Sequence, residues 1–266
     1  MTDTDLPEHV RANREYWDAR ARHWVVAGER LWSLAEPVWG QWEVPDAEVR
    51  LLPDDMTGTA AIELGCGTGY VSAWMTRRGA MVTAIDNSEQ QLAIARRLAR
   101  DHGLDVTWLH GNAETVPRPD ASFDYAVSEY GASIWCDPRV WVREAHRLLR
   151  PGGTMAFLGT HPLAAACAPL DGSVTAHTLV RPWFDLHRLD WRIVPVDPGG
   201  VEFTLPTSGW FRLFDEIGFD VVDYREPRPA ASRGDTPFSV PGVWARDYPS
   251  EQVWKVRKRD RTPAQV

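Results

Sequence analysis

The sequence predicts an α/β fold in which a doubly wound, mostly parallel sheet carries helices on both faces. Between residues 59 and 161, short apolar segments of strand length alternate with helical segments. A glycine-rich turn, "ELGCGTGY" (63–70), lies between the first strand and the first helix. The second strand ends on Asp86, 21 residues after Gly65, the first glycine of that turn.

The order of the elements follows from the apolar pattern and from the helix caps. Strands are expected at 59–64, 80–86, 105–111, 123–130 and 154–161, and helices at 69–79, 88–103 and from 137 onward. Ser88 with Gln91 three residues later is a capping-box pattern, and Asp137 before Pro138 is typical of a helix start. Strands joined by such helical crossovers run parallel, so the sheet is mostly parallel.

The segments on either side of this alternation differ from it. Residues 8–36 read as helix, because Val10, Trp17, Trp24 and Leu31 recur every seven residues and form one apolar stripe. After residue 161 the alternation stops, and Pro-rich segments alternate with regular elements. These are expected as an insertion at 162–206, a helix at 208–219, a strand at 220–226, a second insertion at 227–249 and a closing strand at 251–259.

Composition limits the classes of function. The net charge is −8, and only two of the 29 basic residues are lysines, which speaks against nucleic acid as a partner. The three cysteines, Cys66, Cys136 and Cys167, lack the CxxC spacing of a zinc site, and no HxH or HxxxH pair occurs. No apolar run is long enough to cross a membrane, and the acidic N-terminus does not resemble a signal peptide. We therefore expect a cytoplasmic protein without a metal and without a membrane partner.

The glycine-rich turn distinguishes between two cofactor classes. A dinucleotide fingerprint requires its third glycine at position 70, where this chain has Tyr70. Glu63, just before the turn, would repel a pyrophosphate but suits a ligand that carries an ammonium group. Asp86 is placed to accept hydrogen bonds from both hydroxyls of a ribose. Both acids favour S-adenosylmethionine over a dinucleotide.

Five motifs in register carry a family resemblance. "ELGCGTGY", "AIDNSEQQL", "GNAETVP", "FDYAVSEYG" and "LLRPGG" resemble the motifs of class I S-adenosylmethionine-dependent methyltransferases over about residues 59–160. The resemblance implies a Rossmann-like, seven-stranded sheet whose last strand is antiparallel. It also implies a cofactor site at the carboxyl ends of the first four strands, with S-adenosylhomocysteine as the product.

The resemblance also implies which residues contact the cofactor. Gly65 and Gly67 would lie against its methionine moiety, Asp86 would hold the ribose, and the backbone carbonyl of Ser128 would face the ammonium group. The family often has Met at position 91 and Asp at position 112, where this chain has Gln and Asn. The expected cofactor set is Tyr16, Glu63, Gly65, Cys66, Gly67, Gly69, Asp86, Asn87, Gln91, Asn112, Ala113, Glu114 and Ser128.

The sequence also predicts how the chain divides into a core and the segments that cover it. Residues 1–55 are expected to form an N-terminal helical lid, and 56–161 the core that binds the cofactor. Residues 162–206 would be a lid insertion over the substrate pocket. Residues 207–266 would complete the sheet and contain the second insertion.

Two side chains are candidates for the chemistry because they follow the fourth and fifth strands, near the expected position of the methyl group. Glu129 could act as a base, orient a cationic amine or bind backbone as a structural acid. His161 could take a proton, or be a buried, hydrogen-bonded histidine. The expected substrate-binding residues are Trp17, Trp24, Tyr130 and Trp183. The tryptophans outside the sheet would either wall a flat substrate or bury the lid itself.

These observations predict a methyltransferase that acts on an N, O or electron-rich carbon atom of a small, aromatic or indole-like molecule in natural product biosynthesis. A homodimer is compatible with this prediction. The alternatives are a methyltransferase acting on protein or RNA, and a non-catalytic sensor that binds S-adenosylmethionine. The acidic charge speaks against RNA, and "SEYG" stands where enzymes that methylate nucleobase nitrogens carry Asn/Asp-Pro-Pro-Tyr.

Overall fold

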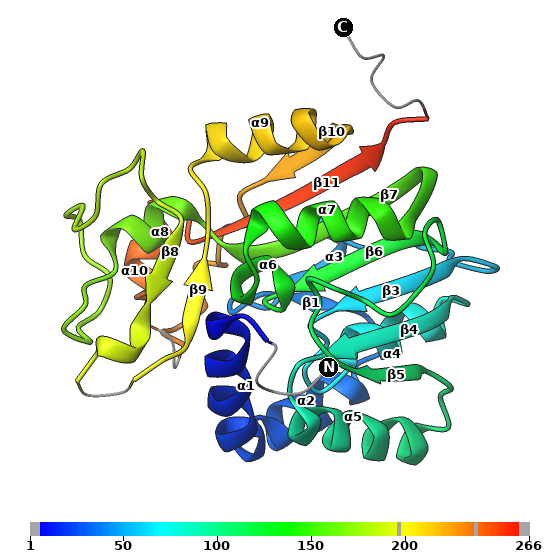
Figure 1. Cartoon of the computed structure of the whole chain (residues 1–266). Coiled ribbons are helices and arrows are strands. Elements are labelled where there is room, and N and C mark those ends of the chain that lie inside the picture. The colour runs from blue at the N-terminus through cyan, green and yellow to red at the C-terminus, as the bar shows by residue number, and fades with distance from the viewer. Residues whose placement is uncertain (1–5, 196–197, 237–238, 261–266) are drawn as a thin grey trace, which may run out of the picture.

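A computed structural model describes residues 6–195, 198–236 and 239–260, and shows a seven-stranded sheet with helices on both faces (Figure 1). The strand order is β10-β11-β7-β6-β3-β4-β5. The strands are β3 (Ala60–Leu64), β4 (Met81–Asp86), β5 (Thr107–His110), β6 (Phe123–Glu129), β7 (Leu149–Thr160), β10 (Phe219–Arg225) and β11 (Glu251–Lys258).

The directions of the strands confirm the predicted fold. Strand β3 pairs in parallel with β4 and β6, and β6 pairs in parallel with β7. The last strand, β11, lies between β7 and β10 and is antiparallel to both. Among the strands, the largest difference from the predicted bounds is that β7 begins at Leu149 instead of at residue 154, and an irregularity in its pairing with β6 accommodates the extra turn-like residues. Because β3, β4, β5 and β6 run in the same direction, their carboxyl ends meet at one edge of the sheet.

Two sets of helices cover the two faces of the sheet. Helices α4 (Tyr70–Arg77) and α5 (Glu89–His102) contribute to one apolar cluster, and α7 (Pro138–Leu148) and α9 (Thr207–Ile217) to the other. The two N-cap residues are those that the sequence predicts, but only half of the Ser88–Gln91 capping box forms, because the Ser88 N–H donates to Asp86 Oδ1 and not to the Gln91 side chain. The Ser88 hydroxyl accepts from the Gln91 N–H at the start of α5, and the Asp137 side chain accepts from the Arg139 N–H at the start of α7.

The N-terminal segment is helical but not continuous. It comprises α1 (Glu8–Arg20), the 3-10 turn η2 (Ala21–Trp24) and α2 (Val25–Ser33), where the sequence predicted one helix over 8–36. A small hairpin, β1 (Val38–Trp39) and β2 (Val44–Pro45), and α3 (Asp46–Val49) follow. The indoles of Trp32, Trp39 and Trp42 are buried, and their N–H groups donate to Thr68 O, Asp46 Oδ1 and Ser250 Oγ. For these three tryptophans, the role of burying the covering segment explains their presence.

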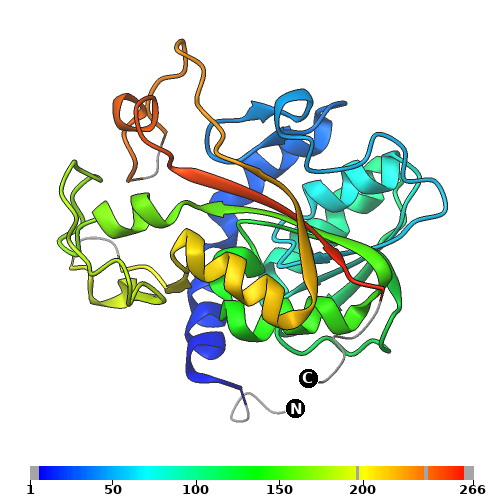
Figure 2. The ribbon, with the colours of Figure 1, turned by 90° about the horizontal axis from the view of Figure 1, so that it is seen from above.

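The two insertions lie beyond the same end of the sheet. The first contains α8 (Pro162–Cys167), β8 (Arg188–Asp190), η3 (Trp191–Ile193) and β9 (Val201–Phe203), and β8 pairs with β9 beside α1 (Figure 1). The second contains α10 (Gly242–Ala245) and packs its Trp244 into the same apolar cluster as Trp42 of the N-terminal segment. Figure 2 shows both insertions at the end of the sheet where β7 and β10 finish and β11 begins. Within the described ranges, no helix is long and apolar enough to span a bilayer.

Candidate functional site

The glycine-rich turn between β3 and α4 has three left-handed residues, and each glycine is required for a different reason. Gly65, Gly67 and Gly69 have φ of 78°, 51° and 80°, which favour glycine over residues with a side chain. A Cβ on Gly65 would lie 2.6 Å from the backbone nitrogen of Ala132, so this turn touches the chain that follows β6. A Cβ on Gly69 would lie 2.6 Å from the ring of Trp108. A Cβ on Gly67 would meet no atom within 4 Å, so this part of the turn borders open space.

Asp86 ends β4 and faces the turn. Its Oδ2 accepts from the Gly67 N–H at 2.7 Å, and its Oδ1 accepts from the Ser88 N–H at 2.8 Å. Burial raises the pKa of this carboxyl, while the two backbone hydrogen bonds oppose that rise. A carboxylate has about four acceptor positions. Two of them fix its orientation here, and two remain for a ligand such as the paired hydroxyls of a ribose.

Glu63 lies in β3 at the entrance of the turn and is 2% exposed. The Ser72 hydroxyl donates to its Oε2. Burial, with a smaller contribution from the charges of Glu129 and Asp86, raises its pKa well above the usual range. A cationic ligand at the turn would stabilise the ionised form of Glu63. The neighbouring Cys66 is buried too, and burial raises the pKa of its thiol, so it remains a thiol near neutral pH.

Asn112 and Glu114 lie in the loop after β5, on the side where the resemblance places the adenine. The Oδ1 of Asn112 accepts from the Glu114 N–H at 3.0 Å, and Ala113 between them is buried. The Oε1 of Glu114 accepts from the Asp137 N–H at 2.8 Å and is 2.8 Å from Nε2 of His9 in α1. Glu114 therefore connects this loop to the N-terminal helix.

Asn87 and Gln91 follow β4 and have different surroundings. The side-chain amide of Asn87 donates to Val10 O at 2.7 Å and accepts from Nε of Arg14 at 3.0 Å, so it holds α1. Gln91 is 3% exposed, and no donor in the described part of the chain reaches its Oε1. Buried polar atoms in native proteins normally have a partner. Gln91 Oε1 is therefore a buried acceptor with no donor in the described part of the chain.

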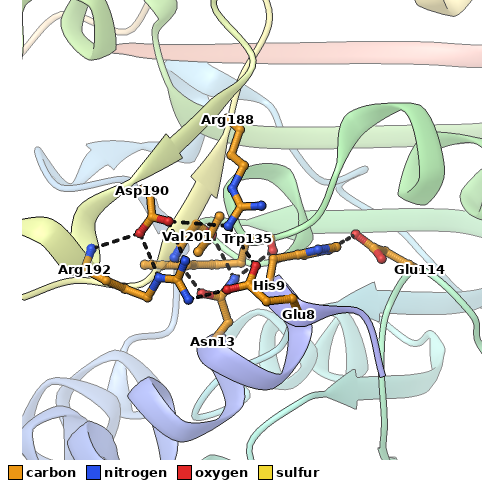
Figure 3. A network of polar contacts seen from close by, with 9 residues as sticks. All are labelled: Glu8, His9, Asn13, Glu114, Trp135, Arg188, Asp190, Arg192 and Val201. Carbon is orange, nitrogen blue, oxygen red and sulfur yellow. Dashed lines mark hydrogen bonds and ion pairs between the residues drawn. The ribbon is translucent and has the colours of Figure 1, made fainter. Parts of the chain in front are cut away.

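Helix α1 joins the core to the first insertion (Figure 3). The buried Asn13 amide donates to Trp135 O at 3.0 Å and to Val201 O at 2.8 Å, and accepts from the Val201 N–H at 2.7 Å. At the surface, Glu8 pairs with Arg188 and Arg192 of the β8–β9 hairpin. One amide side chain thus fixes three segments that are far apart in the sequence.

Aromatic residues gather around the same point. The rings of Tyr16 and Trp17 lie 5.7 Å and 5.2 Å from that of Trp135, and Trp24 lies 5.8 Å from Trp17. Trp183 packs instead on the cluster formed by Ala165, Ala166, Leu186 and Leu189. Of the expected substrate-binding tryptophans, the structure therefore brings Trp17 and Trp24 together and places Trp183 in another cluster.

Glu129 ends β6 at the same edge of the sheet as the glycine-rich turn. Its Oε1 accepts from the Gly40 N–H at 3.0 Å, and its Oε2 accepts from the Tyr70 hydroxyl. Burial raises the pKa of Glu129, and both hydrogen bonds oppose that rise. The next residue, Tyr130, has φ of 50° and donates its hydroxyl to Oε1 of Glu251 at 2.7 Å. Ser128 donates its hydroxyl to Leu64 O and so joins β6 to β3.

His161 uses both of its ring nitrogens within the protein. Its Nδ1 accepts from the Leu163 N–H at 3.0 Å and caps α8, and its Nε2 lies 3.2 Å from Oε1 of Glu226. Burial lowers the pKa of the imidazole, and Glu226 opposes that effect. This arrangement is that of the buried, hydrogen-bonded histidine considered from the sequence. Its role in proton transfer stays a prediction.

Sequence reasoning missed several residues at this edge. In the sequence, Tyr70 only marks the absence of the third glycine of a dinucleotide motif, and the turn at Gly40 and Gln41 contains no motif. Glu251 opens a strand that otherwise reads as apolar and basic. A carboxyl group in that position was the one available signal, because such a residue needs a partner when the strand is buried.

Two surface hollows lie away from this edge. One, of about 490 Å³, is between the N-terminal helices and α5, and the other, of about 440 Å³, is between α7, α9 and residues 184–187. Neither is lined by a residue of the expected site. The described residues contain no group of three or more His, Cys, Asp or Glu side chains that could hold a metal ion.

Comparisons with known proteins agree with the geometry. Residues 62–157 match the model of a methyltransferase domain. The ubiquinone biosynthesis O-methyltransferase of Ruegeria pomeroyi is 32% identical over 62% of each chain, and the malonyl-[acyl-carrier protein] O-methyltransferase of Pectobacterium atrosepticum is 38% identical over 38% of each. The chain thus spans less than two thirds of the length of these curated relatives.

Solved structures show the same fold over more of the chain. An S-adenosylmethionine-dependent methyltransferase from Mesorhizobium loti has a TM-score of 0.62 and 24% identity, over 80% of this chain and 96% of that one. A 1,6-didemethyltoxoflavin-N1-methyltransferase from Burkholderia thailandensis, solved with that substrate and S-adenosylhomocysteine bound, has a TM-score of 0.53 and 18% identity, over 92% and 84%. Residues 62–157 therefore resemble a methyltransferase domain, and the chain has the fold of these solved methyltransferases.

Proposed function

We propose that this protein transfers a methyl group from S-adenosylmethionine to a small-molecule acceptor. The observation that carries the proposal is the arrangement of Gly67 and Asp86. The turn is open at Gly67, and the Asp86 carboxylate is held by backbone N–H groups with acceptor positions to spare. The uncompensated carboxyl of Glu63 at the same turn suits the ammonium group of the cofactor.

The proposed roles of the other cofactor residues follow their positions. Asn112 and Ala113 would border the adenine, and the unpartnered oxygen of Gln91 would accept from a donor on that side. Asn87 and Glu114 would act indirectly, because their side chains hold α1 over the site. The N-terminal segment and the first insertion would thereby form a lid that excludes water from the reaction.

The acceptor is proposed to be flat and aromatic or indole-like, methylated on N, O or an electron-rich carbon. The rings of Tyr16, Trp17, Trp24 and Trp135 support this, because aromatic faces stack on flat molecules and favour the sulfonium charge. A relative acts in ubiquinone biosynthesis, and a structural neighbour binds 1,6-didemethyltoxoflavin. Both support a small acceptor, and we place this protein in natural product biosynthesis.

The transfer itself requires little chemistry from the protein. The acceptor attacks the methyl carbon of the sulfonium, the carbon–sulfur bond breaks, and S-adenosylhomocysteine leaves. The protein must hold the nucleophile in line and, for a protonated nucleophile, accept the proton. Glu129 is proposed as that base, because it lies at the end of β6, beside the turn that Gly65 forms with residues 131–132.

Calorimetry and product detection test this proposal. S-adenosylmethionine and S-adenosylhomocysteine should bind with dissociation constants in about the micromolar range, as expected for a largely pre-formed pocket, and NADH should not bind. Mass spectrometry on a panel of small aromatic acceptors should then show products heavier by one methylene unit. Binding without any methylated product, including on protein and RNA, would favour the non-catalytic sensor instead.

A further inference from the structure

Two buried carboxyl groups meet at one residue of the N-terminal hairpin. Glu129 accepts from the Gly40 N–H, and Glu251 accepts from the N–H of the next residue, Gln41, at 2.7 Å. Gly40 has φ of 69°, and a Cβ there would overlap both carboxyl oxygens of Glu251. The two carboxyls therefore lie on two sides of Gly40. Each also accepts a tyrosine hydroxyl, from Tyr70 and Tyr130 respectively.

No basic side chain compensates this pair. Among the residues that the structure describes, neither Glu129 nor Glu251 forms an ion pair, and Glu63 nearby forms none. Glu251 is fully buried, and burial with the charge of Glu129 raises its pKa to about 8. A buried carboxyl without a cation keeps its proton to a higher pH. Burial without a cation therefore favours the protonated form of Glu251, and a bound cation would favour its ionised form.

One oxygen of the pair is unpartnered. Oε1 of Glu251 accepts two hydrogen bonds, whereas no donor in the described part of the chain reaches Oε2, although it is buried. Leaving such an oxygen without a donor is costly in a protein interior. A ligand group that brings N–H donors would satisfy it.

The residues that bond the pair are partly exposed to solvent. Glu129 and Glu251 are buried, but the four residues that bond them, Gly40, Gln41, Tyr70 and Tyr130, are partly exposed. Glu251 is opposite Thr160 at the end of β7, next to the strand that ends in Glu129. Both carboxyls thus lie at the carboxyl edge of the parallel strands, together with the glycine-rich turn.

We propose that Glu129 and Glu251 bind a protonated amine of the methyl acceptor, which makes the substrate an amine-bearing small molecule. The inference rests on the proposed function, and adds Glu251 as a positioning residue. Once both carboxyls are ionised, the pair offers acceptor oxygens only, so it matches the three N–H donors of an ammonium group and repels a carboxylate or phosphate. Without this ligand, the pair would serve only to hold the Gly40–Gln41 turn.

Matched ligands test the charge preference in the unmodified protein. We expect phenethylamine to bind, in the presence of S-adenosylhomocysteine, at least tenfold more tightly than 3-phenylpropionate, which has a similar size and the opposite charge. Tryptophan fluorescence or calorimetry measures both. Equal binding, or tighter binding of the carboxylate, would overturn the inference while normal binding of S-adenosylhomocysteine kept the proposed function intact.

Proton release on amine binding tests whether the carboxyl pair causes the preference for phenethylamine. Phenethylamine binding near neutral pH should release a fraction of a proton, up to about one, because the cation favours the ionised form of Glu251. Calorimetry in two buffers of different ionisation enthalpy measures that fraction. Glu251→Gln should abolish the release and the tenfold preference, whereas Glu216→Gln, at an exposed position of α9, should change neither. If Glu251→Gln lowers the melting temperature but leaves preference and proton release unchanged, the pair only holds the turn.

Discussion

The proposed site has two halves, one for the cofactor and one for the acceptor, and they are built in different ways. The cofactor half comes from one stretch of chain, since Glu63, the three glycines and Asp86 lie within 24 residues. The acceptor half combines Gly40 from the N-terminal hairpin, Tyr70 from α4, Glu129 from β6 and Glu251 from β11. A local motif allows the chemistry of the first half to be deduced from spacing. The second half exists only after the sheet and its coverings have assembled.

Glu129→Gln has the largest expected effect and concerns the acceptor half. The amide keeps the shape and an acceptor for the Gly40 N–H, but it cannot take a proton. If Glu129 is the base, turnover should fall about 10²–10⁴-fold while the affinity for S-adenosylmethionine barely changes. Single-turnover kinetics and calorimetry measure the two quantities.

His161→Ala is the paired test for Glu129→Gln. Both ring nitrogens of His161 are engaged by Leu163 and Glu226, so its loss should mainly destabilise α8. We expect turnover to fall by less than about tenfold. A fall as large as that of Glu129→Gln would instead make the histidine the proton acceptor and Glu129 its orienting partner.

Asp86→Ala tests the cofactor half. If Asp86 holds the ribose as proposed, the variant should lose two charge-assisted hydrogen bonds and bind S-adenosylmethionine more weakly by about 2–4 kcal/mol in total. Because Asp86 also accepts from the Gly67 and Ser88 N–H groups, thermal denaturation must show that the variant is folded. Unchanged affinity in a folded variant would mean that the ribose lies elsewhere.

Gly65→Ala and Gly67→Ala test which glycine of the turn matters more for stability and which matters for cofactor binding. At Gly65 the new methyl group would clash with the Ala132 backbone, and the alanine would have to adopt a positive φ. The free energy of unfolding should therefore fall by about 2–5 kcal/mol. At Gly67 there is space, and the cost to folding should be about 1–2 kcal/mol from the backbone alone. Chemical denaturation measures both values.

Cofactor binding should rank the two glycine variants in a different way. The methyl group of Gly67→Ala would project into the space left for the ligand, so calorimetry should show weakened S-adenosylmethionine binding in a protein that is nearly as stable as the parent. If Gly67→Ala binds the cofactor normally, the open space beside this residue is not the cofactor site.

The sequence predicted what depends on short-range pattern. The parallel strands of the core and the N-cap residues Ser88 and Asp137 are confirmed, because periodicity and capping act over a few residues. The antiparallel last strand, which the family resemblance implies, is confirmed as well. The break at η2, the early start of β7 and the partners of Glu129 were not predicted. They depend on packing between segments that are distant in the sequence. Nothing local to Glu251 indicates that Tyr130 and Gln41 would bind it.

Asn13→Ala acts outside both halves of the site and tests how the covering segments are held together. Asn13 is 3% exposed and makes three hydrogen bonds to β9 and to Trp135. Its loss leaves the Val201 backbone groups without partners and should cost about 1–3 kcal/mol. This cost should appear as local opening of α1 from the β8–β9 hairpin, because the sheet lies outside this contact. Limited proteolysis should therefore cut residues 8–36 or the first insertion faster in the variant, and S-adenosylmethionine should slow that cleavage.

Arg11, exposed on the same helix, supplies the control Arg11→Ala, which should be cut at the parental rate. If Asn13→Ala is cut no faster than this control, α1 is held by its contacts with Asn87 and Glu114 instead, and the two covering segments open independently.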